Sequence, residues 1–383
     1  MTVVTLKIVA DGDSLLKIVW GEAGSAPLWF DPYFVHRNQL KDRVRACRDV
    51  LRELVSAYID RDFASYDILL PRLARSGSDL HYLLFAGAAE NAYCATTIAT
   101  WLSNLEGPTR LVISSDASIH VPWGMVFSGP DAASSFRGSD IADYGEFWSL
   151  KYQLTVLYSG MSPKPWRNPR PRESFKTLSI VDNEVLQEAR NDLNEAERGL
   201  LEECLELPEG SAKTIEECKQ KWELMKNSDC LLHFFAHASG ISIFLSENDQ
   251  LSIVDLRRKF LDPRRKNQSR IPESLFLLNG CDTAVGDLDN SFLTATAEAG
   301  CCGFVGSEAD LPTRFAIRFG IALLRLLLDS EMSAVEALDK LRRQHWPLGL
   351  LYSCYSHPDF RIKRGKSLTD QPLDERTNFS YLQ

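Results

Sequence analysis

Apolar strand-like segments alternate with helical segments throughout the second half of the chain, and this alternation limits the folds available to it. Helices that lie between successive strands form crossover connections, which place the strands parallel in one sheet and cover both of its faces. The sequence therefore predicts an α/β fold with a mostly parallel sheet flanked by helices. The segments expected to form the sheet are FKTLSIV, CLLHFFAH, SLFLLNGC and CCGFVGS.

The first half mixes strands and helices in another order. TLKIVA and SLLKIVW surround an Asp-Gly-Asp turn, which is typical of a hairpin. Helices are expected over residues 39–58 and 80–103, and RLVISS and SIHVPWGMVF are expected as two further strands. Residues 160–174 hold four prolines and four cationic residues, which favours a linker. We therefore expect an N-terminal α/β region over residues 1–159 and a second domain over residues 175–383.

Composition excludes several classes of protein. The 383 residues are 44% hydrophobic and carry a net charge of −9, so attraction to nucleic acid or anionic lipid is not expected. Nine cysteines without a CxxC pair suggest neither a disulfide framework nor a zinc site. The N-terminus does not resemble a secretory signal, and the apolar stretch FGIALLRLLL is too short to span a bilayer. We expect a cytoplasmic protein that needs no cofactor or metal.

Two chemically active side chains follow consecutive strands. His237 ends CLLHFFAH and Cys281 ends SLFLLNGC, 44 residues later. Ligands of open α/β sheets bind beyond the carboxyl ends of the strands, so the imidazole and the thiol are expected to meet there. An imidazole beside a thiol favours the thiolate, which is the nucleophilic form. His233 is expected to be a structural residue of the strand, and Cys301 and Cys302 are expected to lie in the core.

Several stretches of the chain together resemble the CHAT-type cysteine peptidases, a caspase-like group that also resembles separase. In the catalytic half the resemblance rests on LHFFAHAS, ISIFLSENDQLSIVDLRRK, LFLLNGCDTA, AEAGCCGFVGSEADLP, SAVEALDKLRR and LLYSCYSHPDFRI. Upstream, LVISSDASIHVPWGMVF is similar to an element of the half that precedes the catalytic one. The similarity covers most of residues 109–362. It implies a caspase-like fold with an N-terminal pseudo-caspase-like half.

The resemblance also implies roles for individual residues. Cys281 is the expected nucleophile and His237 the expected acid and base, with the backbone N–H groups of Ala238 and Cys281 binding the oxyanion. Two departures from the family pattern are visible. Ala238 replaces the usual glycine after the histidine, and Asn279-Gly280 replace Ser-Ala before the cysteine.

By the same resemblance, the pocket for the residue before the cleaved bond (P1) draws on Asp182, Asn279 and Glu308, with Asp282 and Asp310 nearby. Carboxylates in such a pocket favour a cationic side chain, because a buried Lys or Arg needs a counter-charge. The expected preference is therefore Arg or Lys at P1.

Prokaryotic relatives of this kind resemble effectors of antiviral or cell-death systems. The expected partners are a protein substrate, such as a gasdermin-like product of a neighbouring gene, and a sensor protein that activates the peptidase. Two alternatives stay open. The chain could be a catalytically silent caspase-like interaction module, or another acyltransferase or thiol hydrolase. The basic run of residues 256–270 is either a solvated helix end or a docking segment for an acidic partner.

Overall fold

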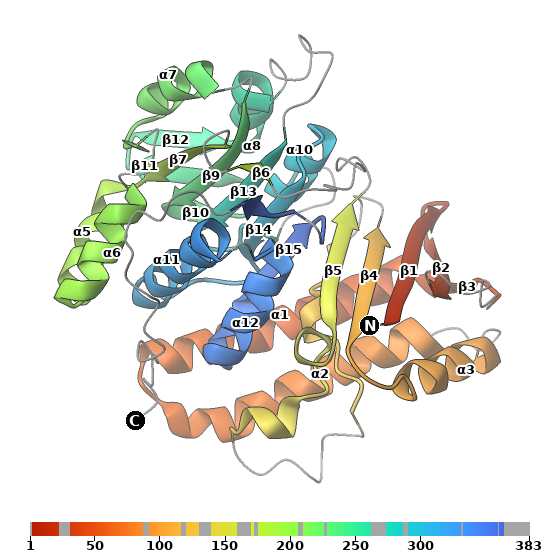
Figure 1. The fold of residues 1–383 in the computed structure, drawn as a ribbon. Helices are drawn as coiled ribbons and strands as arrows, with labels where there is room; N and C mark the ends of the chain where they lie inside the picture. The colour runs from red at the N-terminus through yellow and green to blue at the C-terminus, as the bar shows by residue number, and fades with distance from the viewer. Residues whose placement is uncertain are drawn as a thin grey trace.

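The chain builds two β-sheets that lie next to each other, each covered by helices (Figure 1). The structure is a computed structural model, and it describes residues 2–22, 31–86, 92–115, 120–129, 139–158, 170–171, 175–205, 210–225, 228–261, 273–285, 290–330, 332–358 and 360–363.

The N-terminal sheet has five strands in the order β3-β2-β1-β4-β5. The first two strands form the predicted antiparallel hairpin, and Gly12 takes the left-handed conformation that its turn requires. SIHVPWGMVF is not a strand in its described part, because Pro122 precedes a single 3-10 turn. The strands are β1 (Thr2–Asp11), β2 (Leu15–Glu22), β3 (Tyr33–His36), β4 (Thr109–Ser115) and β5 (Gln153–Tyr158).

Helices and turns of the N-terminal half surround this sheet. The helix predicted over residues 39–58 is confirmed, and its apolar face is buried. The single helix predicted over residues 80–103 is wrong, since this region covers the end of one helix and the whole of the next. The elements are α1 (Arg37–Ile59), η1 (Phe63–Ser65), α2 (Tyr66–Ala86), α3 (Ala92–Ser103), η3 (Trp123–Met125), η4 (Ile141–Tyr144) and α4 (Trp148–Lys151).

The second sheet has six strands in the order β15-β14-β13-β9-β7-β8. Every neighbouring pair is parallel except β14 and β15, which confirms the mostly parallel sheet predicted from the alternation. The strands are β7 (Phe175–Val181), β8 (Ser211–Ala212), β9 (Asp229–Phe235), β13 (Ser274–Asn279), β14 (Gly303–Ser307) and β15 (Tyr352–Ser356).

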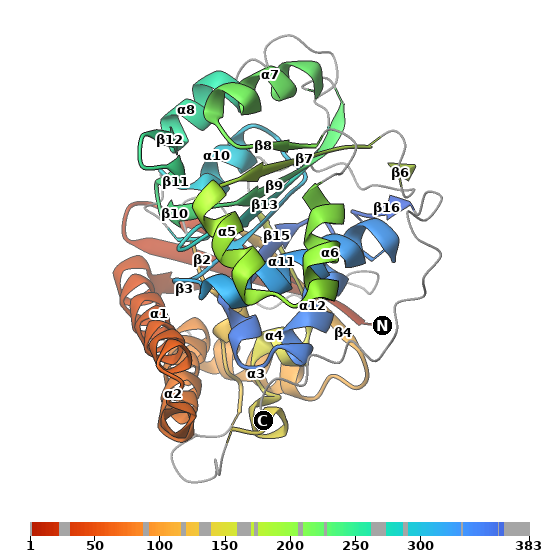
Figure 2. The ribbon, with the colours of Figure 1, turned by 90° about the vertical axis from the view of Figure 1, so that its left-hand side faces the viewer.

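Helices cover both faces of this sheet (Figure 2). One group contains α5 (Asn183–Asp192), α6 (Glu195–Leu205) and α11 (Thr313–Asp329). The other contains α7 (Ile215–Met225), α8 (Ile253–Asp255), the π-helical turn η6 (Leu256–Leu261) and α10 (Phe292–Glu298). The helix α12 (Ala334–Gln344) begins with a capping box between Ser333 and Glu336. The remaining elements are β6 (Arg170–Pro171), β10 (His237–Ser239), β11 (Ser242–Ser246), β12 (Asp249–Ser252), η7 (Leu348–Leu351) and β16 (Ile362–Lys363).

The two sheets meet along their edge strands β5 and β15. The rings of Tyr158 and Tyr355 lie 5.2 Å apart there, and α12 packs against both strands. Buried residues of both halves form one hydrophobic cluster. The predicted linker 160–174 lies outside the described residues except for Arg170 and Pro171, so the division at this segment stays a prediction.

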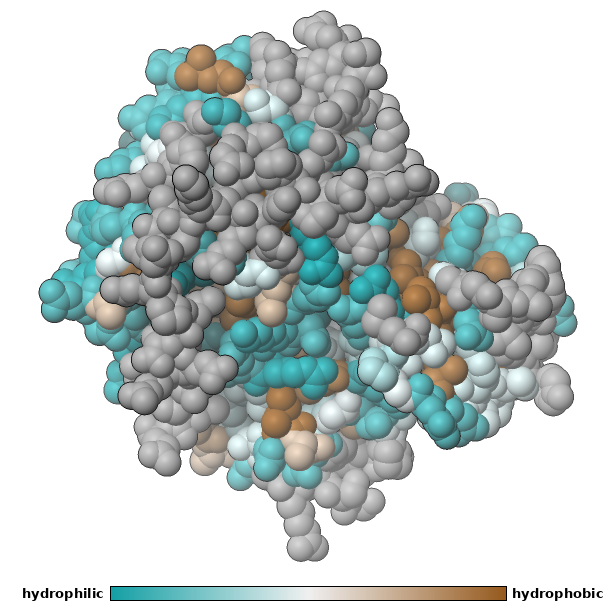
Figure 3. All heavy atoms as spheres, viewed as in Figure 1, coloured by the Kyte–Doolittle hydropathy of each residue, from teal (hydrophilic) through white to brown (hydrophobic). Residues whose placement is uncertain are grey.

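Figure 3 shows the hydropathy of the residues on one face of the molecule. The described residues there are mostly hydrophilic, and hydrophobic ones form small separate patches. Among the described residues, no helix combines the length and the hydropathy needed to cross a membrane.

Candidate active site

The register of two parallel strands brings His237 and Cys281 to the same edge of the sheet. In the β9–β13 ladder, the last paired residues are Phe235 and Asn279. His237 and Cys281 each follow two residues after this pair, beyond the carboxyl ends of neighbouring strands. The two strands are therefore neighbours, as the sequence suggested, and parallel strands carry both side chains to the edge where such folds bind ligands.

Gly280 allows the two strand ends to approach closely. A Cβ atom at Gly280 would lie 2.6 Å from the carbonyl oxygen of Ala236 and 2.8 Å from the Cβ of Ala238. Both distances are too short for real atoms, so only glycine fits here without displacing the backbone. The backbone nitrogen of Ala238 lies 3.6 Å from the same position. The expected oxyanion donor of Ala238 is thus next to the segment that carries Cys281.

Cys281 is in a thiol-favouring environment. It is partly exposed, and its Sγ accepts a hydrogen bond from the backbone N–H of Leu311 at 3.3 Å. Burial raises the pKa of the Cys281 thiol; the Leu311 N–H opposes this rise, and the charges of Asp310 and Asp282 add to it. The side chain of His237 is exposed and makes no hydrogen bond with the residues that the structure describes. The thiol–imidazole hydrogen bond of an activated pair is therefore not formed in this arrangement.

The turn that carries Cys281 is fixed by hydroxyl groups. The Oγ1 of Thr283 donates to the carbonyl oxygens of Leu278 and Gly280, at 3.0 and 3.2 Å. The Oγ of Ser307, at the end of β14, donates to the same Gly280 oxygen at 2.6 Å. Both hydroxyl side chains are buried, so these bonds are shielded from water. They hold the turn around Cys281 in one conformation.

Helix α1 of the N-terminal half reaches both loops that flank the cysteine. A guanidinium nitrogen of Arg52 lies 3.3 Å from the carboxylate of Asp282, the residue after Cys281. Arg48 makes bonds of 2.7 and 3.0 Å to the buried carboxylate of Glu308, at the end of β14. The site is thus built from both halves of the chain.

The residues expected to form the P1 pocket are already engaged in other bonds. Asp182 is buried and caps α5 by accepting the N–H of Glu184 at 2.8 Å. Asn279 is buried; its Nδ2 donates to the carbonyl of Ala316 at 2.8 Å, and its Oδ1 accepts from the hydroxyl of Tyr352.

Glu308 is likewise unavailable to a ligand. It is 0% exposed, and its second oxygen accepts from the Tyr355 hydroxyl at 3.1 Å. Arg48 and Tyr355 together therefore satisfy both carboxylate oxygens. The structure does not gather Asp182, Asn279 and Glu308 into one open acidic pocket, and of the predicted cluster only Asp310 is exposed.

His233 lies in the interior. Its ring stacks on that of Phe235, and its Nδ1 lies 3.5 Å from the Oγ of Ser179. Burial lowers the pKa of His233 to about 4, so the ring is neutral near pH 7. Cys301 and Cys302 are also buried, as expected for core residues.

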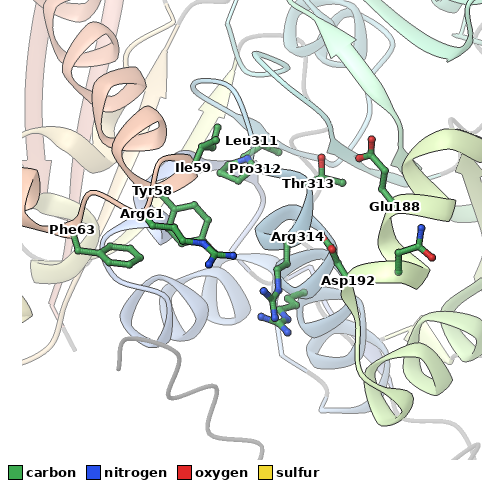
Figure 4. A pocket seen from close by; sticks show the side chains of 12 residues that line it. Tyr58, Ile59, Arg61, Phe63, Glu188, Asp192, Leu311, Pro312, Thr313 and Arg314 are labelled. Atoms are coloured by element: carbon green, nitrogen blue, oxygen red, sulfur yellow. The ribbon is translucent and has the colours of Figure 1, made fainter.

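A groove lies between the end of α1, helix α5 and the start of α11 (Figure 4). Its volume is about 790 Å³, within the range of ligand-binding pockets. Leu311, whose N–H contacts the Cys281 Sγ, is one of its lining residues and connects the groove with the candidate site. One side carries carboxylates and the other carries guanidinium groups and apolar side chains. Its lining is Tyr58, Ile59, Arg61, Phe63, Glu188, Asn191, Asp192, Leu311, Pro312, Thr313, Arg314 and Arg318.

Comparison of the fold identifies its class. The Saccharomyces cerevisiae separase–securin complex matches with a TM-score of 0.52 and 9% identity, over 94% of this chain and 30% of that one. The complex of Porphyromonas gingivalis RgpB pro- and mature domains gives a TM-score of 0.41 and 11% identity, over 72% and 71% of the two chains, which is too low to carry an argument. No family model and no curated protein matches the chain.

The chain therefore has a caspase-like fold, with its central sheets flanked by helices. One solved structure that shares the fold is separase in its complex with securin, and this chain spans about 30% of the length of that one. The likeness concerns the fold alone, so the activity has to be argued from the residues of this site.

Proposed function

We propose that the protein is a cysteine endopeptidase with Cys281 as nucleophile and His237 as general acid and base. The observation that carries the proposal is the β9–β13 register, because the two residues each follow the carboxyl end of one of these neighbouring strands in a caspase-like fold. Gly280 supports it, because its lack of a side chain lets the two strand ends approach each other. This constellation matches the pairing of nucleophile and base that covalent catalysis requires.

The chemistry follows from these positions. His237 takes the proton of the Cys281 thiol, and the thiolate attacks the peptide carbonyl to give a tetrahedral oxyanion. The N–H groups of Ala238 and Cys281 stabilise that oxyanion. Collapse breaks the C–N bond as the imidazolium protonates the leaving amine, which leaves a thioester. A water molecule deprotonated by His237 then attacks the thioester, releasing the acid and restoring the thiol.

The resting contact of Cys281 supports a latent enzyme. Its Sγ accepts the Leu311 N–H, and burial raises the pKa of its thiol. Activation requires that His237 replaces this contact. Such a rearrangement agrees with the expectation that a sensor protein switches the peptidase on, which comes from the resemblance to CHAT-type peptidases.

The proposed substrate is a polypeptide of a specific protein partner. The groove begins at Leu311 and offers apolar, cationic and anionic side chains to an extended segment. Asp310, exposed and close enough to Cys281 to raise the pKa of its thiol, is the carboxylate that supports a preference for Arg or Lys at P1. The role in prokaryotic defence and a gasdermin-like substrate are carried over from the family resemblance. The separase of the compared structure is itself bound to a protein, securin.

Two features favour the alternative, a catalytically silent interaction module. Ala238 departs from the family's glycine, and Cys281 bonds to Leu311 rather than to an imidazole. The reactivity of Cys281 separates the two functions, because a cysteine paired with a histidine reacts faster than an unpaired one.

The test is the rate at which iodoacetamide alkylates Cys281 in the wild type, His237→Ala and His36→Ala, read by peptide mass spectrometry. Each protein is expressed in cells with its genomic neighbours, so that the activating partner is present. His36 is an exposed imidazole at the end of β3 and serves as the matched control. We expect His237→Ala to slow alkylation at pH 7 by about tenfold, a change of one unit in thiol pKa, and His36→Ala to leave it unchanged. Equal rates in all three proteins would support the silent module.

A further inference from the structure

Two arginines on α1 stand one helical turn apart and hold the two loops around the nucleophile. Arg48 and Arg52 are four residues apart, so their side chains leave the same face of the helix. Arg48 binds Glu308, which starts the segment leading to Leu311. Arg52 binds Asp282, which directly follows Cys281. Asp282 in turn donates its backbone N–H to the carbonyl of Ala309 at 3.3 Å, which links the two loops.

Asp282 occupies an unusual backbone conformation. Its φ angle of 53° lies in the left-handed region, which costs energy for a residue with a side chain. The ion pair with Arg52 is the contact that draws its carboxylate toward α1. Since Asp282 is the next residue after Cys281, any change in its conformation also moves the nucleophile.

The charges around the thiol are mainly negative. Asp282, in the same turn, and Asp310, on the segment after β14, both oppose formation of the thiolate. Asp282 is faced from α1 by Arg52 and, further away, by Arg48. Arg52 is the closer of the two cations, and it shares its charge with Asp49 on its own helix at 3.1 Å. His237 on β10, Glu308 after β14 and Tyr352 on β15 are further titratable groups at this edge.

We propose that Arg52 is a positioning residue of the candidate active site, which fixes the Cys281 turn through Asp282 and offsets the negative charge beside the nucleophile. The N-terminal half would thereby take part in forming the catalytic centre. This inference rests on the proposed role of Cys281 and adds a residue from the other half of the chain.

The inference predicts opposite effects for the two partners. Removing Arg52 leaves the Asp282 carboxylate without its nearest counter-charge, so the thiol pKa rises and less thiolate is present. Replacing Asp282 with Asn removes a negative charge, so the thiol pKa falls. Asn also tolerates the left-handed conformation, which makes Asp282→Asn a mild change to the backbone. Once Asp282 is neutral, loss of Arg52 should have little further effect.

The experiment is a double-mutant cycle on the full chain, with the pH profile of Cys281 alkylation by iodoacetamide as readout. The variants are Arg52→Ala, Asp282→Asn and their combination, with Arg52→Lys as the charge-conserving variant. Arg43→Ala is the matched control, because Arg43 lies on the same helix and pairs with the exposed Asp79 at 3.0 Å. Thermal melting of each variant establishes that it is folded.

We expect Arg52→Ala to slow alkylation at pH 7 by about threefold and to shift the profile to higher pH, since half a unit of thiol pKa changes the thiolate fraction by about that factor. Asp282→Asn should speed alkylation. Arg52→Lys should keep most of the wild-type rate. In the Asp282→Asn background, Arg52→Ala should change the rate less than twofold. If Arg52→Ala does not fold, the rates of Asp282→Asn and Arg52→Lys decide the matter.

An effect of Arg52→Ala that is equal in both backgrounds, no larger than that of Arg43→Ala, or opposite in sign would overturn the inference. The readout needs no substrate, so it is independent of peptidase activity. A failed cycle in a protein that shows Cys281-dependent cleavage rejects only the role of Arg52. A successful cycle without cleavage rejects only the proposed peptidase.

Discussion

The buried ion pair between Arg48 and Glu308 should be the most costly polar contact to break between the two halves of the chain. The side chains are 10% and 0% exposed, and their closest atoms lie 2.7 Å apart. Arg48→Met leaves the Glu308 carboxylate buried, with the Tyr355 hydroxyl as its hydrogen-bond donor among the side chains that the structure describes. Removing one member of a buried pair costs about 3–5 kcal/mol, because the remaining charge is neither paired nor hydrated. The melting temperature should fall by on the order of 10 °C.

Urea denaturation and thermal melting measure this loss, and two further variants isolate its cause. Arg43→Met on the same helix breaks the exposed pair with Asp79 and should cost at most about 1 kcal/mol. Arg48→Met combined with Glu308→Gln removes both charges and should recover most of the stability. If Arg48→Met costs no more than Arg43→Met, or if the double variant is as unstable as the single one, the pair does not hold the halves together as argued.

Three further predictions concern the edge of the sheet. Gly280→Ala places a Cβ 2.6 Å from the oxygen of Ala236 and should displace the nucleophile, so the rate of cleavage should fall by about 100-fold. A folded variant that cleaves at the wild-type rate would contradict the role of this close approach. Asn279→Ala leaves the Tyr352 hydroxyl without its partner and should cost about 1–3 kcal/mol in urea denaturation; a neutral effect would show that the bond is not structural. The pKa of His233 is about 4 in the folded protein and about 6.5 in the unfolded chain. Between pH 7 and pH 5 the unfolded chain therefore binds a proton at His233 and the folded protein does not, so the free energy of unfolding should fall by about 2 kcal/mol. His233→Gln should remove that part of the pH dependence, and an unchanged slope would refute the assignment.

The sequence predicts the sheet of the second half well, for a physical reason. Segments such as SLFLLNGC have a continuous apolar centre instead of an alternating pattern, which is typical of a strand buried on both faces. The positions of His237 and Cys281 at neighbouring strand ends follow from the same reasoning, because one crossover unit separates them. Local signals such as the capping box of Ser333 are also readable, since they depend on residues only three positions apart.

Contacts between distant segments were not predictable in the same way. The sequence predicts that Glu308 faces a substrate, yet Glu308 pairs with Arg48, which lies 260 positions earlier in the chain. Arg48 belongs to a helix that is predicted from its apolar residues alone. Arg48 falls on that apolar face, between Cys47 and Leu51 in sequence, and a buried arginine signals a buried carboxylate elsewhere. The sequence does not say which carboxylate it is. The contact of Leu311 with Cys281 depends on a backbone N–H, which carries no mark in the sequence.

The central claim is that His237 and Cys281 form the catalytic pair of a peptidase. The most direct measurement is mass spectrometry of protein N-termini in cells that express the wild-type chain with its genomic neighbours, compared with cells that express Cys281→Ala or His237→Ala. The account predicts new N-termini with the wild type that are absent with both variants, and the residue before each new terminus reads the P1 preference directly. The same set of N-termini in all three samples would contradict it.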